Sequence, residues 1–101
     1  LGMVSGLAIS DFVDALAAGD PAEVLTKLHE LIEKGVELSQ FVNQLIDQLR
    51  ILLLLNVGRD ATLVDLPDSL LAKAQKQAAQ FTAPQLLHTI RALTEASQAL
   101  R

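Results

Sequence analysis

Apolar residues recur along the chain at helical spacing, in segments separated by glycines, prolines and residues that favour helix starts. The first segment follows Ser5, a preferred N-cap residue, and we expect its helix to run to about Ala18, where Gly19 ends it. The residues spaced for burial on this helix are Leu7, Phe12, Val13 and Leu16.

The second segment has the clearest helix start in the chain. Asp20 is placed as the N-cap, Pro21 as the first helical residue and Glu23 at the capping-box position. Gly35 is the expected left-handed residue after the helix. The predicted apolar stripe consists of Val24, Leu25, Leu28, Leu31 and Ile32.

A longer helix is predicted over about residues 38–57, and the short link before it makes it the antiparallel neighbour of the second helix. Its first half is amphipathic, with an apolar face formed by Leu38, Phe41, Val42, Leu45 and Ile46. After Leu49 the polar face disappears, because each residue turns the chain by about 100° and Ile51–Leu55 therefore face every direction. Such a helix is surrounded by other elements, either within its own bundle or partly by a neighbouring subunit.

Gly58 is expected to close the third helix, and Pro67 to lie in the first turn of a fourth helix that runs to about Gln80. Asp65 or Leu66 is the expected cap of this fourth helix. In the loop between the two helices, the residues expected to hold the chain on the core are Leu63, Val64 and Leu66.

The fifth helix begins with Thr82 as its cap and Gln85 in the reciprocal capping-box position. Its apolar stripe reaches the end of the chain through Leu86, Leu87, Ile90, Leu93 and Leu100. The whole pattern predicts an all-α fold, a small bundle of about five helices in a single domain over residues 1–101. Since the chain opens on Leu1 and its one methionine is Met3, we expect a piece of a longer protein.

Composition and charge narrow the classes of function. The 101 residues contain no cysteine and carry a formal charge of −4, with 8 basic and 12 acidic side chains. Disulfide frameworks and thiolate metal sites are therefore excluded, and direct nucleic-acid binding is disfavoured because so few cations are available to neutralise phosphates. The longest apolar run is too short for a membrane span, and the first residues lack a signal-peptide pattern, so we expect a cytoplasmic location.

The side chains that could support catalysis do not form a recognisable pattern. His29 and His88 lie on different predicted helices without a metal-ligand spacing. Asp20 and Glu23 are explained by helix capping, and no serine lies in a nucleophile-elbow motif. We expect no catalytic, cofactor or metal site and no small-molecule substrate, and an enzyme that uses His29 or His88 is the weakest hypothesis.

Several segments, in this order and spacing, resemble a known family. They are Ala17-Ala18-Gly19-Asp20, Gly35-Val36-Glu37-Leu38, the helix Phe41–Leu55 with its apolar end, Leu66-Pro67, and Phe81-Thr82. Together they resemble the third domain of the bacterial DNA polymerase III gamma/tau subunit, over essentially the whole chain.

The resemblance implies a non-catalytic helical collar domain that follows the ATPase modules of a clamp loader in DNA replication. Collars of several subunits pack into a ring in that family, so the implied partners are other clamp-loader subunits, including copies of this chain. Residues 1–4 then correspond to the end of the linker from the preceding domain, and the family continues beyond Leu100-Arg101. ATP and zinc belong to the preceding domains of the parent protein.

Our first hypothesis is therefore an oligomerisation domain that uses the apolar end of the third helix and the outer face of the fifth. The predicted interface residues are Leu49, Ile51, Leu52, Leu54, Leu55, Ile90 and Leu93. The alternative from another class is a stand-alone helical adaptor that offers a groove to an amphipathic partner helix.

Overall fold

Helices make up most of the computed structural model, which describes residues 4–58 and 64–100. In chain order they are α1 (Gly6–Ala18), α2 (Pro21–Glu33), α3 (Leu38–Gly58), α4 (Asp68–Ala78) and α5 (Ala83–Ala99). This arrangement confirms the predicted all-α fold of five helices. Two residues predicted for the chain ends and loops, Leu1 and Leu63, lie outside the described residues.

The predicted N-caps of α1, α2 and α5 are present. The Ser5 hydroxyl accepts a hydrogen bond from the backbone N–H of Ala8 at 3.1 Å, and the Asp20 carboxylate accepts two from the first turn of α2. Thr82 and Gln85 form the full capping box, with bonds of 2.9 and 3.2 Å between the side chain of each and the backbone N–H of the other. These bonds satisfy N–H groups that have no partner inside a helix.

Two details of the helix ends differ from the prediction. Glu23 does not complete a capping box, because its carboxylate lies 3.6 Å from the Lys27 ammonium one turn later. Pro67 is itself the N-cap residue of α4, so that helix begins one residue later than predicted and neither Asp65 nor Leu66 caps it. Proline supplies no side-chain acceptor for a cap, so the sequence signal for this start was weak.

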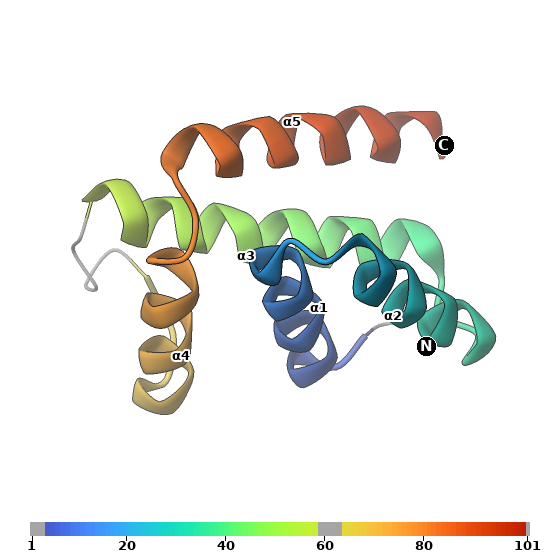
Figure 1. Cartoon of the computed structure of the whole chain (residues 1–101), viewed down its shortest axis with the longest axis horizontal. Coiled ribbons are helices and arrows are strands. Elements are labelled where there is room, and N and C mark those ends of the chain that lie inside the picture. Colours follow the sequence, from blue (N-terminus) through green and yellow to red (C-terminus); the bar gives the residue numbers. More distant parts are fainter. Residues whose placement is uncertain (1–3, 59–63, 101) are drawn as a thin grey trace.

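The longest helix, α3, lies at the centre of the arrangement (Figure 1). α5 runs antiparallel to it along one side, while α1, α2 and α4 lie on the other side. α2 also runs opposite to α3, as predicted, but its main contact is with α1 and not with α3. α1 in turn contacts α3 and α4. It therefore connects α2 and α4 within the layer formed by α1, α2 and α4, which we refer to as the lower layer.

The core follows α3 from Phe41 to Leu55. The largest side chains with almost no exposed surface are Val13, Leu45, Leu49, Leu52 and Leu86. Near the start of α3, the rings of Phe12 and Phe41 meet edge to face with their centroids 5.0 Å apart. Val64 and Leu66 pack against this core, which confirms that part of the loop prediction.

Two polar side chains of α3 form hydrogen bonds to the backbone of segments next to α1 and α4. The Gln44 amide oxygen accepts a hydrogen bond from the Val4 backbone N–H at 2.8 Å, and its amide nitrogen donates one to the Val4 carbonyl oxygen at 2.7 Å. Val4 is buried and belongs to the core. The Asn56 amide donates to the carbonyl oxygens of Ala78 and Phe81, at 2.9 and 2.8 Å. Ala78 is the last residue of α4, and Phe81 lies in the segment between α4 and α5. Asn56 therefore anchors this connecting segment to α3.

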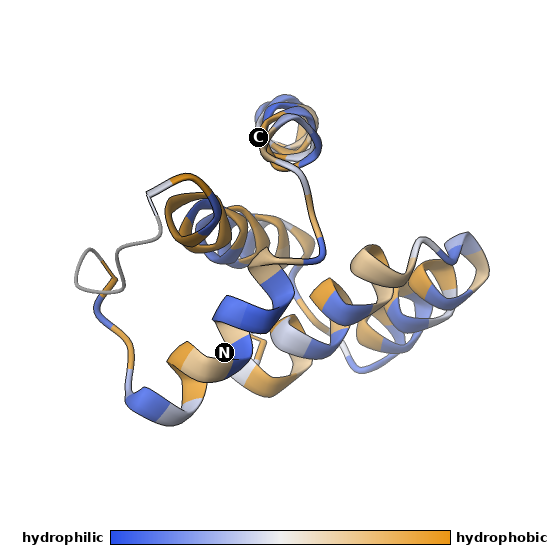
Figure 2. Ribbon diagram, turned by 60° about the vertical axis from the view of Figure 1, so that its left-hand side comes forward, coloured by the Kyte–Doolittle hydropathy of each residue, from blue (hydrophilic) through white to orange (hydrophobic). Residues whose placement is uncertain are grey.

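Several apolar residues that were predicted to be buried are exposed. They are Leu7 on α1, Leu25 and Ile32 on α2, Leu38 at the start of α3, and Leu87 and Leu100 on α5. The prediction of their burial is wrong, because the neighbouring helices cover only part of each apolar stripe. Figure 2 shows hydrophobic residues on α2 and α5 alternating with hydrophilic ones around each ribbon.

Candidate functional site

The residues of the predicted interface have different surroundings in the structure. Leu49 and Leu52 have 0% of their surface exposed and Leu55 has 7%, so α4, α5 and α1 of the same chain already cover them. Ile51 is half-buried against the core. Leu54, in contrast, is 46% exposed and has apolar surface that another chain could contact.

The α5 members of the predicted interface also lie partly in the core. Ile90 and Leu93 are half-buried and pack against it. Leu93 differs from Ile90 because it also lines an open groove on the surface. Three of the seven predicted interface residues are thus buried in the core, and the other four retain solvent-accessible surface.

The groove in question is a wholly apolar hollow of about 500 Å³ at the N-terminal half of α3. α3 forms its floor, α5 one wall, and α2 with part of α1 the other wall. Its lining consists of Phe12, Leu16, Val24, Leu28, Leu38, Phe41, Val42, Leu45, Thr89, Leu93, Ala96, Ala99 and Leu100. We refer to this feature as the groove.

The groove stays open because α5 packs on α3 but not closely on α2. In Figure 2, α5 stands apart from the helices of the lower layer. The wall residues of α5 include Ala96 and Ala99, which are too short to reach across to α2. The apolar stripe of α2 is therefore only partly covered by the described part of the chain, whereas Phe41, Val42 and Leu45 of α3 are 2–6% exposed.

Exposed apolar side chains extend the groove onto α2. Leu25 and Ile32 lie three residues before and four residues after Leu28, so all three share one face of the helix. Leu25 and Ile32 are exposed, while Leu28 lines the groove and packs against the core. The groove and this stripe together form a contiguous apolar surface of the kind that marks interaction sites.

The strongest polar cluster of the structure joins α1 to α4. The buried Gln77 amide nitrogen donates to the Asp14 carboxylate at 2.7 Å and to the Ser10 carbonyl oxygen at 3.0 Å. Lys73 completes the cluster, with its ammonium 3.5 Å from Asp14 and 3.8 Å from Asp11. These contacts all run from α4 to α1, so the effect of the cluster is to fix the two helices against each other.

Neither histidine lines the groove or takes part in this cluster. His29 is exposed on α2 and faces Glu33 at 3.0 Å, and His88 is exposed on α5. Among the described residues 4–58 and 64–100, no three His, Asp or Glu side chains gather closely enough to hold a metal ion. None of the helices within the same ranges is long and apolar enough to cross a membrane.

The fold and the groove define a small all-helical domain with an uncovered apolar surface. The comparison with known protein families then identifies it more closely. All 101 residues match the family described as DNA polymerase III subunits gamma and tau domain III, and the chain belongs to this family.

Relatives of known name agree with this assignment. The chain is 34% identical over 84 residues to the DNA polymerase III subunit gamma/tau of Mycobacterium tuberculosis and to that of Mycobacterium bovis. The matched region is 80% of this chain but 14% of each relative, so the chain spans a small part of their length. A search of the solved structures found no significant match. The resemblance inferred from the sequence is thus confirmed.

Proposed function

We propose that the chain is the part of a DNA polymerase III gamma/tau subunit that holds this subunit to others in a clamp loader, without catalysing a reaction itself. The single observation that carries this proposal is the apolar groove, together with the exposed stripe on α2. Burial of apolar surface is the main driving force of protein association. A groove lined by apolar side chains and Thr89, whose hydroxyl donates to the Gln85 carbonyl oxygen, offers a contact of this kind.

The proposed contact surface differs from the one expected from the sequence. Leu54 and Leu93 remain candidates because they keep exposed or groove-lining surface, with Ile51 and Ile90 beside them. The core residues of α3 contribute indirectly, by fixing the helices that build the surface. Proteins of the clamp loader are the proposed partners, and any ATP or zinc is bound by other domains of the parent subunit.

The test is to place a charge in the groove of the intact subunit that contains this chain. We expect Leu28→Asp and Leu100→Asp to weaken its association with other clamp-loader subunits by about tenfold or more, because each places a charge in an apolar contact. The matched control for Leu100 is Leu70→Asp, since Leu70 is 48% exposed and Leu100 43%, but Leu70 lies on α4 and does not line the groove. Association is measured by sedimentation velocity, after circular dichroism has shown that each variant is folded. Unchanged association of both folded groove variants would contradict the proposal.

A second candidate function uses the same groove. A stand-alone adaptor would bind an amphipathic helix there, and the volume and apolar lining of the groove favour a helical ligand. Such an adaptor would bind its ligand without any other clamp-loader subunit. Loss of subunit association in the groove variants therefore separates the two functions.

A further inference from the structure

A cleft of about 260 Å³ between α3 and α5 shares no lining residue with the groove. Its lining consists of Asn43, Ile46, Asp47 and Arg50 from α3 and Thr94, Ser97 and Gln98 from α5. Six of these seven side chains are polar, and the seventh, Ile46, is only 6% exposed. We refer to this feature as the polar cleft. Its chemistry is that of hydrogen bonds and charge, in contrast to the groove.

A hydrogen bond between the two helices fixes one side of the polar cleft. Ser97 is 6% exposed, and its hydroxyl donates to the Asn43 amide oxygen at 3.1 Å. Because this bond uses the oxygen of the amide, the Asn43 Nδ2 group remains available as a donor. The Thr94 hydroxyl donates to the Ile90 carbonyl oxygen of its own helix at 2.8 Å, so it adds no donor to the polar cleft.

Arg50 supplies the positive charge of the polar cleft. A nitrogen of its guanidinium lies 3.8 Å from a carboxylate oxygen of Asp47, which is beyond hydrogen-bond distance. The two side chains are 60% and 75% exposed, so water weakens their attraction. The guanidinium therefore keeps its planar set of N–H donors for another acceptor.

The donors and charges of the polar cleft define the ligand that it fits. Arg50, Asn43 and the exposed Gln98 amide bring N–H donors to one small space. A carboxylate is a planar acceptor that a guanidinium binds through two parallel hydrogen bonds, and amide N–H groups can complete its coordination. Asp47 balances the charge of Arg50, so the polar cleft accepts a singly charged anion more readily than a phosphate dianion.

We propose that the polar cleft binds a carboxylate group of a polypeptide. The carboxylate belongs either to a glutamate or aspartate side chain or to a chain terminus. This site is separate from the surface used in the proposed function, so either can stand without the other. Because the charges are exposed, a single carboxylate should bind with a dissociation constant on the order of millimolar.

The experiment titrates the 101-residue chain with small carboxylates and follows nuclear magnetic resonance signals of the polar cleft. The probes are N-acetylglutamate amide for a side-chain carboxylate and N-acetylalanine for a chain terminus, with N-acetylglutamine amide as the uncharged control at equal ionic strength. We expect a carboxylate probe to shift the side-chain N–H signals of Asn43, Gln98 and Arg50 until they saturate. The uncharged control should leave them in place.

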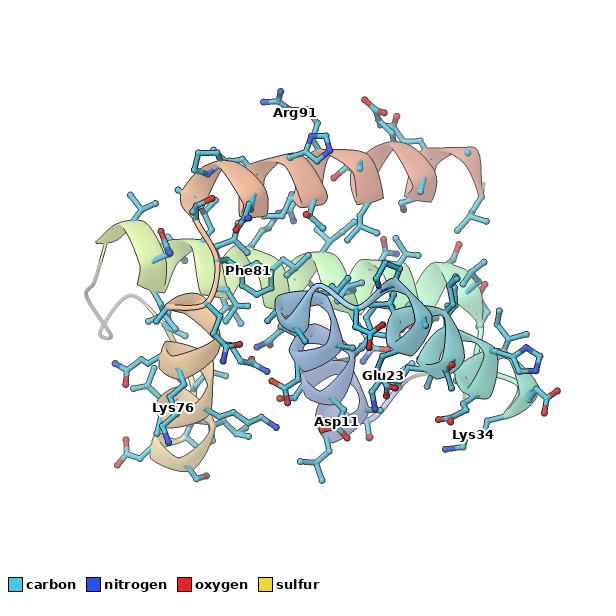
Figure 3. The ribbon with its side chains drawn as sticks, in the orientation of Figure 1. Asp11, Glu23, Lys34, Lys76, Phe81 and Arg91 are labelled. Atoms are coloured by element: carbon cyan, nitrogen blue, oxygen red, sulfur yellow. The ribbon has the colours of Figure 1, made fainter. Side chains whose placement is uncertain are left out.

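Two variants assign the binding to Arg50. Arg50→Gln should weaken binding at least about fivefold, because it removes the charge and the paired donors. The matched control is Arg91→Gln, since Arg91 is exposed on α5, does not line the polar cleft and points away from α3 in Figure 3. This control should bind the probes as the unaltered chain does. Circular dichroism confirms that both variants are folded.

The outcome of the titration decides the proposal and the source of the carboxylate. Saturation by N-acetylglutamate amide supports a side-chain ligand, and saturation by N-acetylalanine supports a chain terminus. Three results would overturn the carboxylate site: no saturable shift with either carboxylate, equal shifts with the uncharged control, or unchanged binding by folded Arg50→Gln. None of these results bears on the groove, which the association of the groove variants tests separately.

Discussion

The two halves of α3 differ in sequence pattern and in the helices beside them, yet most apolar residues of both are buried. The second half, Leu49–Leu55, has no polar face in sequence, yet most of it is covered by other helices of the same chain. The first half has an ordinary amphipathic pattern, yet its apolar face borders the open groove. The width of an apolar stripe therefore indicates how much of a helix requires cover, but not which chain provides it.

The difference comes from the helices that surround each half. α4, the end of α1 and the start of α5 converge on the second half, and Asn56 anchors the link between α4 and α5 there. Over the first half, α5 presents Ala96 and Ala99, and α2 packs on α1 and not on α3. Small side chains on α5 and the displacement of α2 keep the groove open, although Phe41, Val42 and Leu45 in its lining are only 2–6% exposed.

The largest expected effect distinguishes a fully buried residue in the second half of α3 from an exposed groove residue at its start. Leu52→Ala should lower the free energy of unfolding by about 2–5 kcal/mol, because it leaves a cavity around a side chain with no exposed surface. Leu38→Ala, at a groove residue with 38% of its surface exposed, should cost less than about 1 kcal/mol. Urea unfolding followed by circular dichroism measures both. Equal losses at the two positions would mean that the groove is filled in solution.

An intermediate effect is expected at the anchor of the covered half. Asn56→Ala removes both donors to the Ala78 and Phe81 carbonyl oxygens and should cost about 1–3 kcal/mol. The control is Asn43→Ala, because Asn43 is exposed and its amide oxygen accepts one bond from Ser97. This control should cost about 0.5 kcal/mol in the same urea titration. A control that costs as much as Asn56→Ala would show that the anchor adds nothing specific.

The smallest effect on stability is expected on the stripe beside the groove. Leu25→Gln should change the free energy of unfolding by less than about 0.5 kcal/mol, because Leu25 is exposed on α2. The same change should reduce the binding of a hydrophobic fluorescent dye, since it shortens the apolar surface next to Leu28. Leu70→Gln on α4 serves as the control for dye binding and should leave it unchanged. A large loss of stability at Leu25 would show that this side chain is covered in solution.

The sequence predicted the helices well and the surfaces poorly, for reasons that particular residues show. Ser5, Asp20 and Thr82 cap helices where they were expected to, because a cap depends on a bond to the next few residues. Gly35 has the expected positive φ angle, 81°, and Gly19, which was predicted to end the first helix, has one of 68°, a conformation that glycine adopts without steric cost. Each of these features is local.

The position and lining of the groove were not predicted, although its residues were recognised as apolar. Leu28 and Leu93 were placed on buried stripes, and no pattern in the sequence distinguishes a stripe that meets a neighbouring helix from one that does not. The only available signal was the width of the α2 stripe, with five apolar residues on a helix of 13. A stripe of that width requires cover on more than one side.

By itself, the sequence determined the all-α class, the ends of most helices and the family, because caps, turns and helical spacing act over a few residues. Only the tertiary structure decided that Leu49, Leu52 and Leu55 are core residues and that the groove stays open. Burial of apolar surface has no preferred direction, so a leucine is satisfied by any neighbour that excludes water. Which neighbour does so depends on how α2 and α5 pack around α3, and this is a property of the whole chain.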